Sequence, residues 1–473
     1  MLKTKIVCTI GPACEDEKTL RELMLAGASV IRFNFSHANY ERDREKFKLV
    51  DKLRNELGLH VGTMLDTKGP EIRLGKFKDS VPVVINDGDE YTLTTEECVC
   101  DEKKACISFK GLPKDVSIGT RLLINDGLVE LKVKKVCDTE ILCDIIHGGK
   151  LSDRKSINVP GIKLSLPYIS NADMEDLKFG AELGFDFVAA SFVRSGADVI
   201  YLRKFLESLG WYTPRIIAKI ENMDGVKNID EILEAADGVM VARGDMGVEI
   251  PFEQIPALQK EIIHKAYNAG KQVITATQML ESMINNPRPT RAEITDVANA
   301  IYDGTSAIML SGETAAGNFP VEAVKTMASI AKTTEKTIDY SKIFSKNDYN
   351  TNSSITNAIS HATVTTAHDL NANAIITVTK KGSTARMISK YRPFSPIIGM
   401  TTSKTVCRQL ALSWGIYPAL LDEKQSTDEL IEHAIIRAKE CGFVKENDLV
   451  VVTAGVPLGV SGTTNLLQVE IVK

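Results

Sequence analysis

The sequence predicts an α/β protein built from a parallel (β/α)8 barrel of the TIM type, an inserted all-β domain and a C-terminal α/β domain. Strand-like segments alternate with helical ones up to about residue 340, and eight such strands can be counted. The alternation is interrupted once by short β-type runs, and it returns in a separate segment at the end of the chain. The expected domains are residues 1–70 with 168–339, residues 71–167, and residues 340–473.

Length and charge limit the classes of function. A chain of 473 residues is long enough for about three domains with large cores. Its formal net charge of -5 provides no broad cationic surface for nucleic acid or a membrane, so any anion must be bound by a local cluster of cations. The first residues contain too short an apolar run for a secretory signal, and no segment approaches the length of a membrane span.

The nine cysteines are an odd number and do not follow the spacing of metal ligands. Cys98, Cys100 and Cys106 come closest to a cluster, but they are interpreted as strand residues. Because nothing indicates export, we expect reduced thiols that pack as small hydrophobic groups in a cytoplasmic protein.

The first 70 residues place polar side chains at the ends of buried strands. Arg32, Asn34 and Ser36 share one face of the second strand, because side chains two residues apart point to the same side. Asp66 and Thr67 end the third strand. The expected elements are strands at 5–10, 30–36 and 61–67 and helices at 17–26 and 40–57.

The alternation of strands and helices stops after the Gly-Pro pair at 69–70. Short β-type runs are separated by turn sequences at 86–89, 125–127 and 148–149, which are typical of hairpins. The inserted domain enters and leaves the parallel domain at neighbouring points, a geometry that suits a lid.

From residue 171 the strand–helix alternation resumes and supplies the other five strands of the barrel. Helices of about three turns separate the strands, as parallel connections require. The expected strands are 186–192, 216–221, 238–245, 272–277 and 304–313, and the expected helices are 172–183, 197–209, 226–236, 251–269 and 291–302, with a last helix from 320.

The segment 215–249 is the strongest candidate for chemistry. Its first strand ends with Lys219 and Glu221, and its second ends with Arg243 and Asp245. In each pair the two residues are two positions apart, so both side chains are expected to point to the same side of the strand. Active sites of α/β proteins lie at the carboxyl ends of parallel strands. Two carboxylates suit a hard divalent cation that keeps coordination sites for a substrate, and the two cations suggest an anionic ligand. The alternative is a structural ion-pair cluster at the barrel rim.

The C-terminal segment contains a candidate anion site. A strand at 374–379 is followed by the loop Lys380-Lys381-Gly382-Ser383-Thr384, which opens a helix. Lysines, hydroxyl groups and exposed amides at a helix start are typical of phosphate sites. The Gly-rich segment 453–464 is expected to close over the same ligand. An ordinary turn with a helix cap is the alternative.

Seven motifs together resemble those of pyruvate kinases, in order and in spacing, over essentially the whole chain. No single motif is specific, but the set is. The motifs are CTIGPAC, IRFNFSHAN, MLDTKGPEIR, AKIEN, MVARGDMGVEI, ATQMLESM and MLSGETA. The resemblance implies the barrel, an inserted small β-barrel lid and the C-terminal α/β domain. It also implies transfer of a phosphoryl group from phosphoenolpyruvate to ADP, giving pyruvate and ATP.

The resemblance assigns substrate and metal roles to five residues. Glu221 and Asp245 are similar to the ligands of Mg²⁺ (or Mn²⁺), and Lys219 to the lysine that balances charge on the phosphoryl group and the enolate. Gly244 matches a backbone amide that holds the substrate carboxylate with help from Thr277. The same threonine is the candidate for the proton relay to the enolate.

The resemblance also assigns the phosphoryl, nucleotide and K⁺ contacts. It matches Arg32 to the arginine that meets the phosphoryl group, and it implies that Glu71 is the residue type of potassium-dependent members. The nucleotide contacts are Asn34, His37, Arg73 and Lys155; the K⁺ ligands are Asn34, Ser36, Asp66 and Thr67; and the effector contacts are Thr379, Lys380, Lys381, Gly382, Ser383 and Thr384.

Several alternatives stay open at the level of sequence. Ser311 and Glu313 either join the proton relay through water or cap a helix after the eighth strand, and His37 either helps hold the nucleotide or packs at a helix start. The expected effector is a phosphorylated metabolite, with fructose 1,6-bisphosphate, ribose 5-phosphate and AMP as the candidates. A homotetramer without an additional phosphotransfer domain is expected from the resemblance. The rival functions are a Mg²⁺-dependent barrel lyase acting on enolpyruvyl or oxaloacetate-type substrates and a non-catalytic metabolite sensor.

Overall fold

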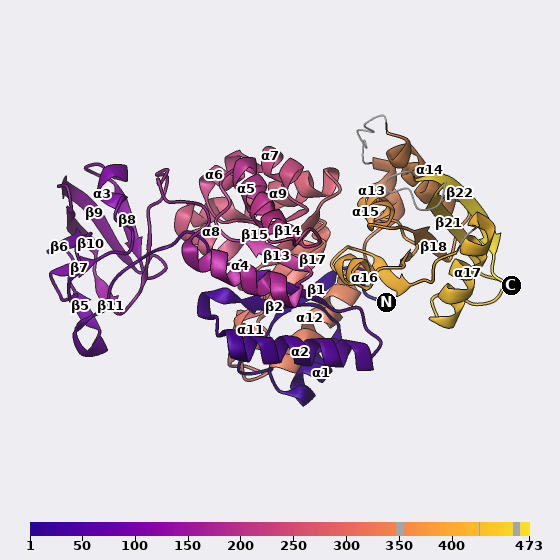
Figure 1. Cartoon of the computed structure of the whole chain (residues 1–473), viewed down its shortest axis with the longest axis horizontal. Helices are drawn as coiled ribbons and strands as arrows, with labels where there is room; N and C mark the ends of the chain where they lie inside the picture. The colour runs from indigo at the N-terminus through magenta and orange to yellow at the C-terminus, as the bar shows by residue number, and fades with distance from the viewer. Residues whose placement is uncertain (347–353, 425, 457–463) are drawn as a thin grey trace.

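The computed structural model describes residues 1–346, 354–424, 426–456 and 464–473. Three units follow one another along the longest axis, with the inserted sheet domain at one end, the barrel in the middle and the C-terminal domain at the other end (Figure 1). None of the described helices is both long and apolar enough to span a membrane.

The central unit is a closed barrel of eight parallel strands, as the alternation predicts. Each strand is short and buried on both faces, which is the pattern of a parallel sheet covered by helices. The order around the barrel is β1-β17-β16-β15-β14-β13-β3-β2. The strands are β1 (Lys5–Thr9), β2 (Ala28–Asn34), β3 (Gly62–Asp66), β13 (Phe187–Ala190), β14 (Arg215–Ile220), β15 (Gly238–Ala242), β16 (Gln272–Ala276) and β17 (Ala307–Leu310).

Helices surround the barrel, and several begin at capping residues that satisfy free backbone amides. Asp16 caps α1 by accepting from Thr19 N, while Ser170 and Thr290 form capping boxes at α4 and α10. The helices are α1 (Glu17–Ala26), α2 (Tyr40–Glu56), α4 (Asn171–Leu183), α5 (Gly196–Ser208), α6 (Met223–Lys227), α7 (Ile229–Ala235), α8 (Arg243–Glu249), α9 (Ile255–Asn268), α10 (Arg291–Tyr302), α11 (Gly312–Ala315) and α12 (Pro320–Glu335), with short 3-10 turns η1 (Phe35–His37), η2 (Lys78–Ser80), η3 (Phe252–Gln254) and η4 (Glu281–Ile284).

Two barrel strands end three residues earlier than the sequence suggested, because the chain turns into a helix. β15 stops at Ala242, and Arg243–Glu249 forms helix α8; β17 stops at Leu310, and Gly312–Ala315 forms α11. Side chains two residues apart share a face only within a strand. The expectation that Arg243 and Asp245 point the same way is therefore wrong, because both lie in the first turn of a helix.

The inserted domain is a curled sheet in the order β4-β12-β8-β9-β10-β6-β7, with a separate hairpin of β5 and β11. An isolated bridge between Leu74 and Ile107 brings the two edges of the sheet together. Asn125 and Asp126 both have positive φ and Gly127 follows, which is the turn chemistry expected between paired strands. The elements are β4 (Ile72–Arg73), β5 (Val83–Ile85), β6 (Glu90–Thr94), β7 (Lys104–Cys106), α3 (Leu112–Asp115), β8 (Arg121–Ile124), β9 (Val129–Val136), β10 (Glu140–His147), β11 (Gly149–Leu151) and β12 (Ser156–Asn158).

The cysteines of this domain depart from the expectation that they are all strand residues. Cys106 lies in β7, but Cys100 makes only an isolated bridge to Phe77, and Cys98 lies in the preceding loop. All nine cysteines of the chain are described, and each is a free thiol.

The C-terminal domain is an α/β sheet in the order β20-β19-β18-β21-β22, with β22 antiparallel to β21. Helices cover it on both sides (Figure 1). The elements are α13 (Tyr340–Lys346), α14 (Ile355–Asp369), β18 (Ala374–Val378), α15 (Ser383–Lys390), β19 (Ile397–Thr401), α16 (Lys404–Leu410), β20 (Ile416–Leu420), α17 (Thr427–Glu440), β21 (Leu449–Gly455) and β22 (Thr464–Ile471).

This domain packs on the amino-terminal end of the barrel. Leu412 is fully buried in the cluster that fills the barrel interior, together with Met64, Phe187 and Met240. Arg408 in α16 donates from Nε to both carboxylate oxygens of Asp186, at 2.8 and 3.0 Å. The carboxyl ends of the strands are thereby left to face the inserted domain.

Candidate active site

Lys219 occupies the centre of a buried charge cluster at the carboxyl end of the barrel. Its Nζ lies 2.9 Å from Glu221 Oε1 and 3.1 Å from Asp66 Oδ1, and it donates to Ser191 Oγ at 2.8 Å. Burial alone would lower the pKa of Lys219, but Asp66 and Glu221 outweigh burial and raise it. The ammonium group is therefore a fixed positive charge at neutral pH.

Glu221 has the properties of a cation ligand. Its Oε2 accepts from the Phe192 amide at 2.6 Å, while its buried Oε1 is paired with the Lys219 ammonium group at 2.9 Å. Burial raises the pKa of Glu221 to about 8, Lys219 opposes the shift, and Asp245 adds to it. A divalent cation would restore the charged form of this carboxylate and complete its coordination. The donor atoms of Glu221 and Asp245 thus fit a hard cation.

Arg32 and Asp66 form the neighbouring part of the cluster. Arg32 donates from Nε to Asp66 Oδ2 and from Nη1 to Thr9 Oγ1, at 2.5 and 2.9 Å. Burial would raise the pKa of Asp66, but Arg32 and Lys219 outweigh it, and the pKa falls below its ordinary value. Asp66 therefore stays ionised and holds both cations at the rim.

Thr277 and Gly244 are brought together although they are 33 residues apart. The Gly244 amide donates to Thr277 Oγ1 at 2.8 Å, and this hydroxyl donates to the Ala276 carbonyl at 2.6 Å. Thr277 has a φ of 70°, and Gln278 and Phe192 are also at positive φ. Such backbone is unfavourable for a β-branched residue and is concentrated at functional sites.

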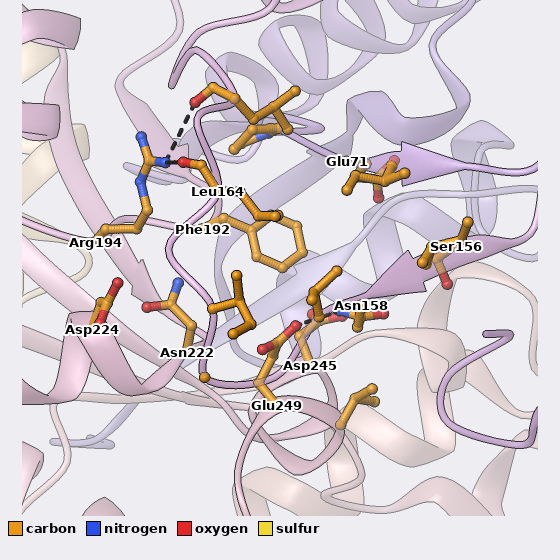
Figure 2. A pocket seen from close by; sticks show the side chains of 18 of the residues that line it. Glu71, Ser156, Asn158, Leu164, Phe192, Arg194, Asn222, Asp224, Asp245 and Glu249 are labelled. Carbon is orange, nitrogen blue, oxygen red and sulfur yellow. Dashed lines mark hydrogen bonds between the residues drawn. The ribbon is translucent and has the colours of Figure 1, made fainter. Parts of the chain in front are cut away.

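Asp245 faces a cavity between the barrel and the inserted domain, with a volume of about 390 Å³. Figure 2 shows Asp245, Glu249 and Asn222 on the barrel side, Ser156 and Asn158 on strand β12 of the inserted domain, and Glu71 just before β4. Asn158 donates to Glu249 Oε1 at 2.8 Å across the cavity wall. The cavity thus lies between the inserted domain and Asp245, and it is also lined by Phe192, whose amide holds Glu221.

Arg73 and Lys155, the two cations expected at the nucleotide, both line this cavity. Arg73 donates to Glu71 Oε2 from Nε at 2.8 Å, and its Nη1 donates to the Arg154 carbonyl at 2.8 Å. Lys155 lies on the adjacent segment, because the Leu74 amide donates to its carbonyl at 2.9 Å. The residues predicted to flank the nucleotide therefore lie on neighbouring segments of the sheet.

The expected K⁺ ligands lie at the ends of β2 and β3. Asn34 and Asp66 are register partners, and Asn34 Oδ1 accepts from the Ser36 amide at 3.2 Å. Thr67 O accepts from Ser191 Oγ at 2.6 Å. Carboxylate, amide, hydroxyl and carbonyl oxygens are the donors that hard cations prefer, so this set fits a cation. His37 ends η1, but its side chain lies outside the described structure.

Glu313 is fully buried and caps backbone amides. Its Oε1 accepts from Leu280 N at 3.0 Å, and its Oε2 accepts from Ser311 N at 2.8 Å. This is the capping alternative from the sequence, with the glutamate as the capping group. Ser311 Oγ is buried without a hydrogen-bond partner in the described structure.

Arg243 does not face the charge cluster around Lys219. Its Nη2 donates to the Thr277 carbonyl at 2.6 Å, its Nε donates to the Ala276 carbonyl at 3.3 Å, and its Nη1 forms an ion pair with Asp296 at 2.7 Å. The expectation that it sits beside the metal is wrong, because the turn into α8 directs it toward β16. It supports the backbone that carries Thr277.

The sequence reasoning missed Ser191 and the cavity-wall contact between Asn158 and Glu249. Ser191 follows β13 and touches both Lys219 and Asp66. The rule that selected Asp66, a polar residue at the end of a parallel strand, also applies to Ser191. The contact between Asn158 and Glu249 joins segments 91 residues apart and has no local signal in the sequence.

The C-terminal loop expected to bind an effector lies at the opposite end of the barrel. The Lys381 carbonyl accepts from Arg215 and Arg386, each at 3.1 Å, and Thr384 Oγ1 lies 2.7 Å from Thr464 Oγ1. Burial, reinforced by Arg215, lowers the pKa of Arg386 to about 9. Thr379, Lys380 and Gly382 complete this loop between β18 and α15, and Ser383 begins α15. Residues 457–463 of the segment expected to close over it lie outside the described structure.

Comparison with known proteins agrees with this geometry. Residues 1–324 match the family model for the barrel domain of pyruvate kinase, and residues 357–470 match the model for its alpha/beta domain. A pyruvate kinase of Clostridium acetobutylicum is 49% identical over the full length of both chains, and one of Staphylococcus haemolyticus is 48% identical over this whole chain and 81% of its own. A pyruvate kinase structure from Cryptosporidium parvum superposes with a TM-score of 0.94 at 39% identity, covering all of this chain and 96% of that one. The chain belongs to the pyruvate kinase family, whose members are phosphotransferases.

Proposed function

We propose that the chain transfers the phosphoryl group of phosphoenolpyruvate to ADP and forms pyruvate and ATP as the last step of glycolysis in the cytoplasm. The observation that carries this proposal is the buried cluster of Lys219, Glu221, Asp66 and Arg32, which lies beside a cavity that reaches Arg73 and Lys155. Fixed cations on both sides of one cavity suit a reaction that moves a phosphoryl group between two anionic substrates.

Glu221 and Asp245 would hold Mg²⁺ or Mn²⁺. When bound, such an ion neutralises charge on the phosphoryl oxygens and on the enolate oxygen. Lys219 and the Phe192 amide already hold the buried carboxylate of Glu221 in place, so a cation would bind it without first ordering its side chain.

Lys219 and Arg32 supply the positive charge of the protein itself. In the transition state of phosphoryl transfer, negative charge is spread over the equatorial oxygens of the phosphoryl group. Fixed cations stabilise that charge without having to reorganise. The raised pKa of Lys219 makes it a poor proton donor, so its proposed role is electrostatic. Asp66 and Ser191 hold its ammonium group in place.

We propose that the hydroxyl of Thr277 donates a proton in the relay to the enolate. Its hydroxyl lies against the Gly244 amide, the group expected to hold the substrate carboxylate. A substrate carboxylate that accepts a hydrogen bond from the Gly244 N–H would release the Thr277 hydroxyl from this contact. Substrate binding would thereby help to position the hydroxyl group that takes part in the reaction.

K⁺ is the second proposed cation, bound near Asn34, Ser36, Asp66 and Thr67. Glu71 supports its use because it is the residue type that the resemblance links to potassium-dependent members; its carboxylate pairs with Arg73 at 2.7 Å. A phosphorylated effector is proposed at Thr379–Thr384, and a homotetramer as the working assembly, both from family membership.

The test is ATP formation from phosphoenolpyruvate and ADP with Mg²⁺, run in matched K⁺ and tetramethylammonium buffers. We expect turnover in K⁺ and a fall of more than about 10-fold with the organic cation, because a bulky ion cannot occupy an oxygen-lined site. Turnover in neither buffer from folded protein would contradict the proposed reaction. Equal turnover in both would contradict only the K⁺ site.

A further inference from the structure

Three thiols meet at the edge of the inserted domain. The Sγ atoms of Cys98, Cys100 and Cys106 all lie within 4.8 Å of one another, and those of Cys100 and Cys106 are 3.9 Å apart. Across the described residues, this is the single group of three histidine, cysteine or carboxylate side chains that meets such a distance. These thiols lie neither in the charge cluster around Lys219 nor in the C-terminal loop.

The spacing of the sulfur atoms is that of a thiolate site for one metal ion. Zn²⁺ binds thiolate sulfur at about 2.3 Å in tetrahedral geometry, which places two ligand sulfurs about 3.8 Å apart. The separation between Cys100 and Cys106 is close to this value, and it is far longer than a disulfide bond. Thiolates select soft and borderline ions such as Zn²⁺ over Mg²⁺.

The surrounding backbone leaves room for this arrangement. Cys100 N donates to the Lys76 carbonyl at 3.0 Å and Gly75 N donates to the Cys106 carbonyl at 2.8 Å, so one segment braces both thiols. A Cβ at Gly75 would lie 2.2 Å from Cys106 Sγ and 3.1 Å from Cys100 Sγ. Only glycine at this position lets the two sulfur atoms keep their places.

The cluster can be reached from solvent. Cys98 and Cys106 are partly exposed, whereas Cys100 is buried. Burial, reinforced by the neighbouring Cys106, raises the pKa of Cys98, and the ammonium group of Lys104 partly opposes this shift. Because metal ligands must be deprotonated, binding would release protons.

We propose that Cys98, Cys100 and Cys106 form a binding site for one thiophilic metal ion of the Zn²⁺ class. Three thiolates supply the protein ligands, and the exposed side of the cluster leaves the fourth position of a tetrahedral ion to water. The thiol protons go to solvent, and no redox change is involved.

Binding at this site would fasten the edge of the sheet that carries Arg73. Ser108 follows Cys106 by two residues; its amide donates to the Arg73 carbonyl, and its Oγ accepts from the Arg73 amide, both at 2.9 Å. An ion held by Cys106 would therefore restrain the segment that is hydrogen-bonded to β4. We expect slower amide hydrogen exchange in this segment when the ion is bound.

The test is Zn²⁺ binding to the reduced full-length chain, with Mg²⁺ in excess to occupy the carboxylate site. We expect one tightly bound Zn²⁺ per chain, with X-ray absorption showing three sulfur ligands at about 2.3 Å. Cys106→Ser should lower the affinity more than about 10-fold, since even changes around a metal site have effects of that size. The double variant Cys137→Ser with Cys441→Ser, which changes two exposed thiols outside the cluster, should bind like the unchanged chain.

Absence of stoichiometric binding, fewer than three sulfur ligands, or equal affinity in Cys106→Ser would overturn the proposal. Cys98→Ser provides a second variant, because Cys98 lies in a loop and its change leaves strand β7 intact. If Cys106→Ser fails to fold, retained Zn²⁺ affinity in folded Cys98→Ser overturns the proposal, and loss of affinity supports it.

Discussion

At the scale of single residues, the parity of a strand explains which site residues were predictable. Lys219 ends up 2.9 Å from Glu221 because β14 runs to Ile220 and keeps alternate side chains on one side. The same reasoning failed for Arg243 and Asp245, because the chain enters helix α8 at Arg243. The positive φ of Thr277 was not predictable, since the tertiary contacts around it hold a conformation that threonine disfavours.

The hydroxyl of Thr277 is the first prediction at this scale. Thr277→Val keeps the shape of the side chain but removes the group that contacts the Gly244 amide. We expect kcat for ATP formation to fall about 100-fold, the low end for loss of a positioned proton-transfer group. Steady-state kinetics of Thr277→Ser, which keeps a hydroxyl, provide the control. Normal kcat in the valine variant would exclude a role for the hydroxyl.

At the scale of secondary-structure elements, the alternation of strand-like and helical segments predicted the eight barrel strands, whereas pairings between domains could not be predicted. Arg408 in α16 and Asp186 before β13 are 222 residues apart, and neither local sequence predicts that they form an ion pair. Asp186 is completely buried, and burial raises its pKa despite Arg408 and Arg54. The arginine therefore compensates a charge that has no access to water.

Removing Arg408 should be costly for this reason. We expect Arg408→Met to reduce the free energy of unfolding by about 3 kcal/mol, the lower end for breaking a buried pair, since Arg54 remains 3.5 Å from Asp186. Thermal unfolding measures the effect. Arg437→Met, which removes an exposed pair with Glu440 in the same domain, should melt like the unchanged chain. Equal melting of both variants would show that Asp186 tolerates losing this partner.

At the scale of the whole molecule, the order of domains along the chain was predictable but their docking was not. Composition shifts mark the inserted sheet, and alternation marks the two parallel units. The insertion of Leu412 into the barrel and the burial of Lys5 against the C-terminal domain depend on contacts between distant segments. Lys5 donates to the Ile416 carbonyl at 2.6 Å and lies over the ring of Tyr417.

Lys5 should make the stability of this interface depend on pH. Burial lowers its pKa to about 7, so between this value and the ordinary value of 10.5 the unfolded chain binds the proton more strongly. The contribution of Lys5 to stability therefore rises with pH across this window, by about 1.4 kcal/mol per pH unit at most. Melting curves at about pH 7 and about pH 9 should differ less for Lys5→Met than for the unchanged chain or for Lys332→Met, an exposed position on α12. The same pH response in all three would contradict the assignment.

We place phosphoryl transfer at the charge cluster around Lys219. The most direct measurement is ATP formation from phosphoenolpyruvate and ADP by the unchanged chain, by Lys219→Met and by Lys265→Met, whose lysine lies on the outer helix α9. We expect Lys219→Met to lose at least about 100-fold in kcat while its circular dichroism is preserved, since removing one electrostatic group costs this much. Lys265→Met should remain active. Comparable turnover in folded Lys219→Met would contradict the assignment of phosphoryl transfer to this cluster.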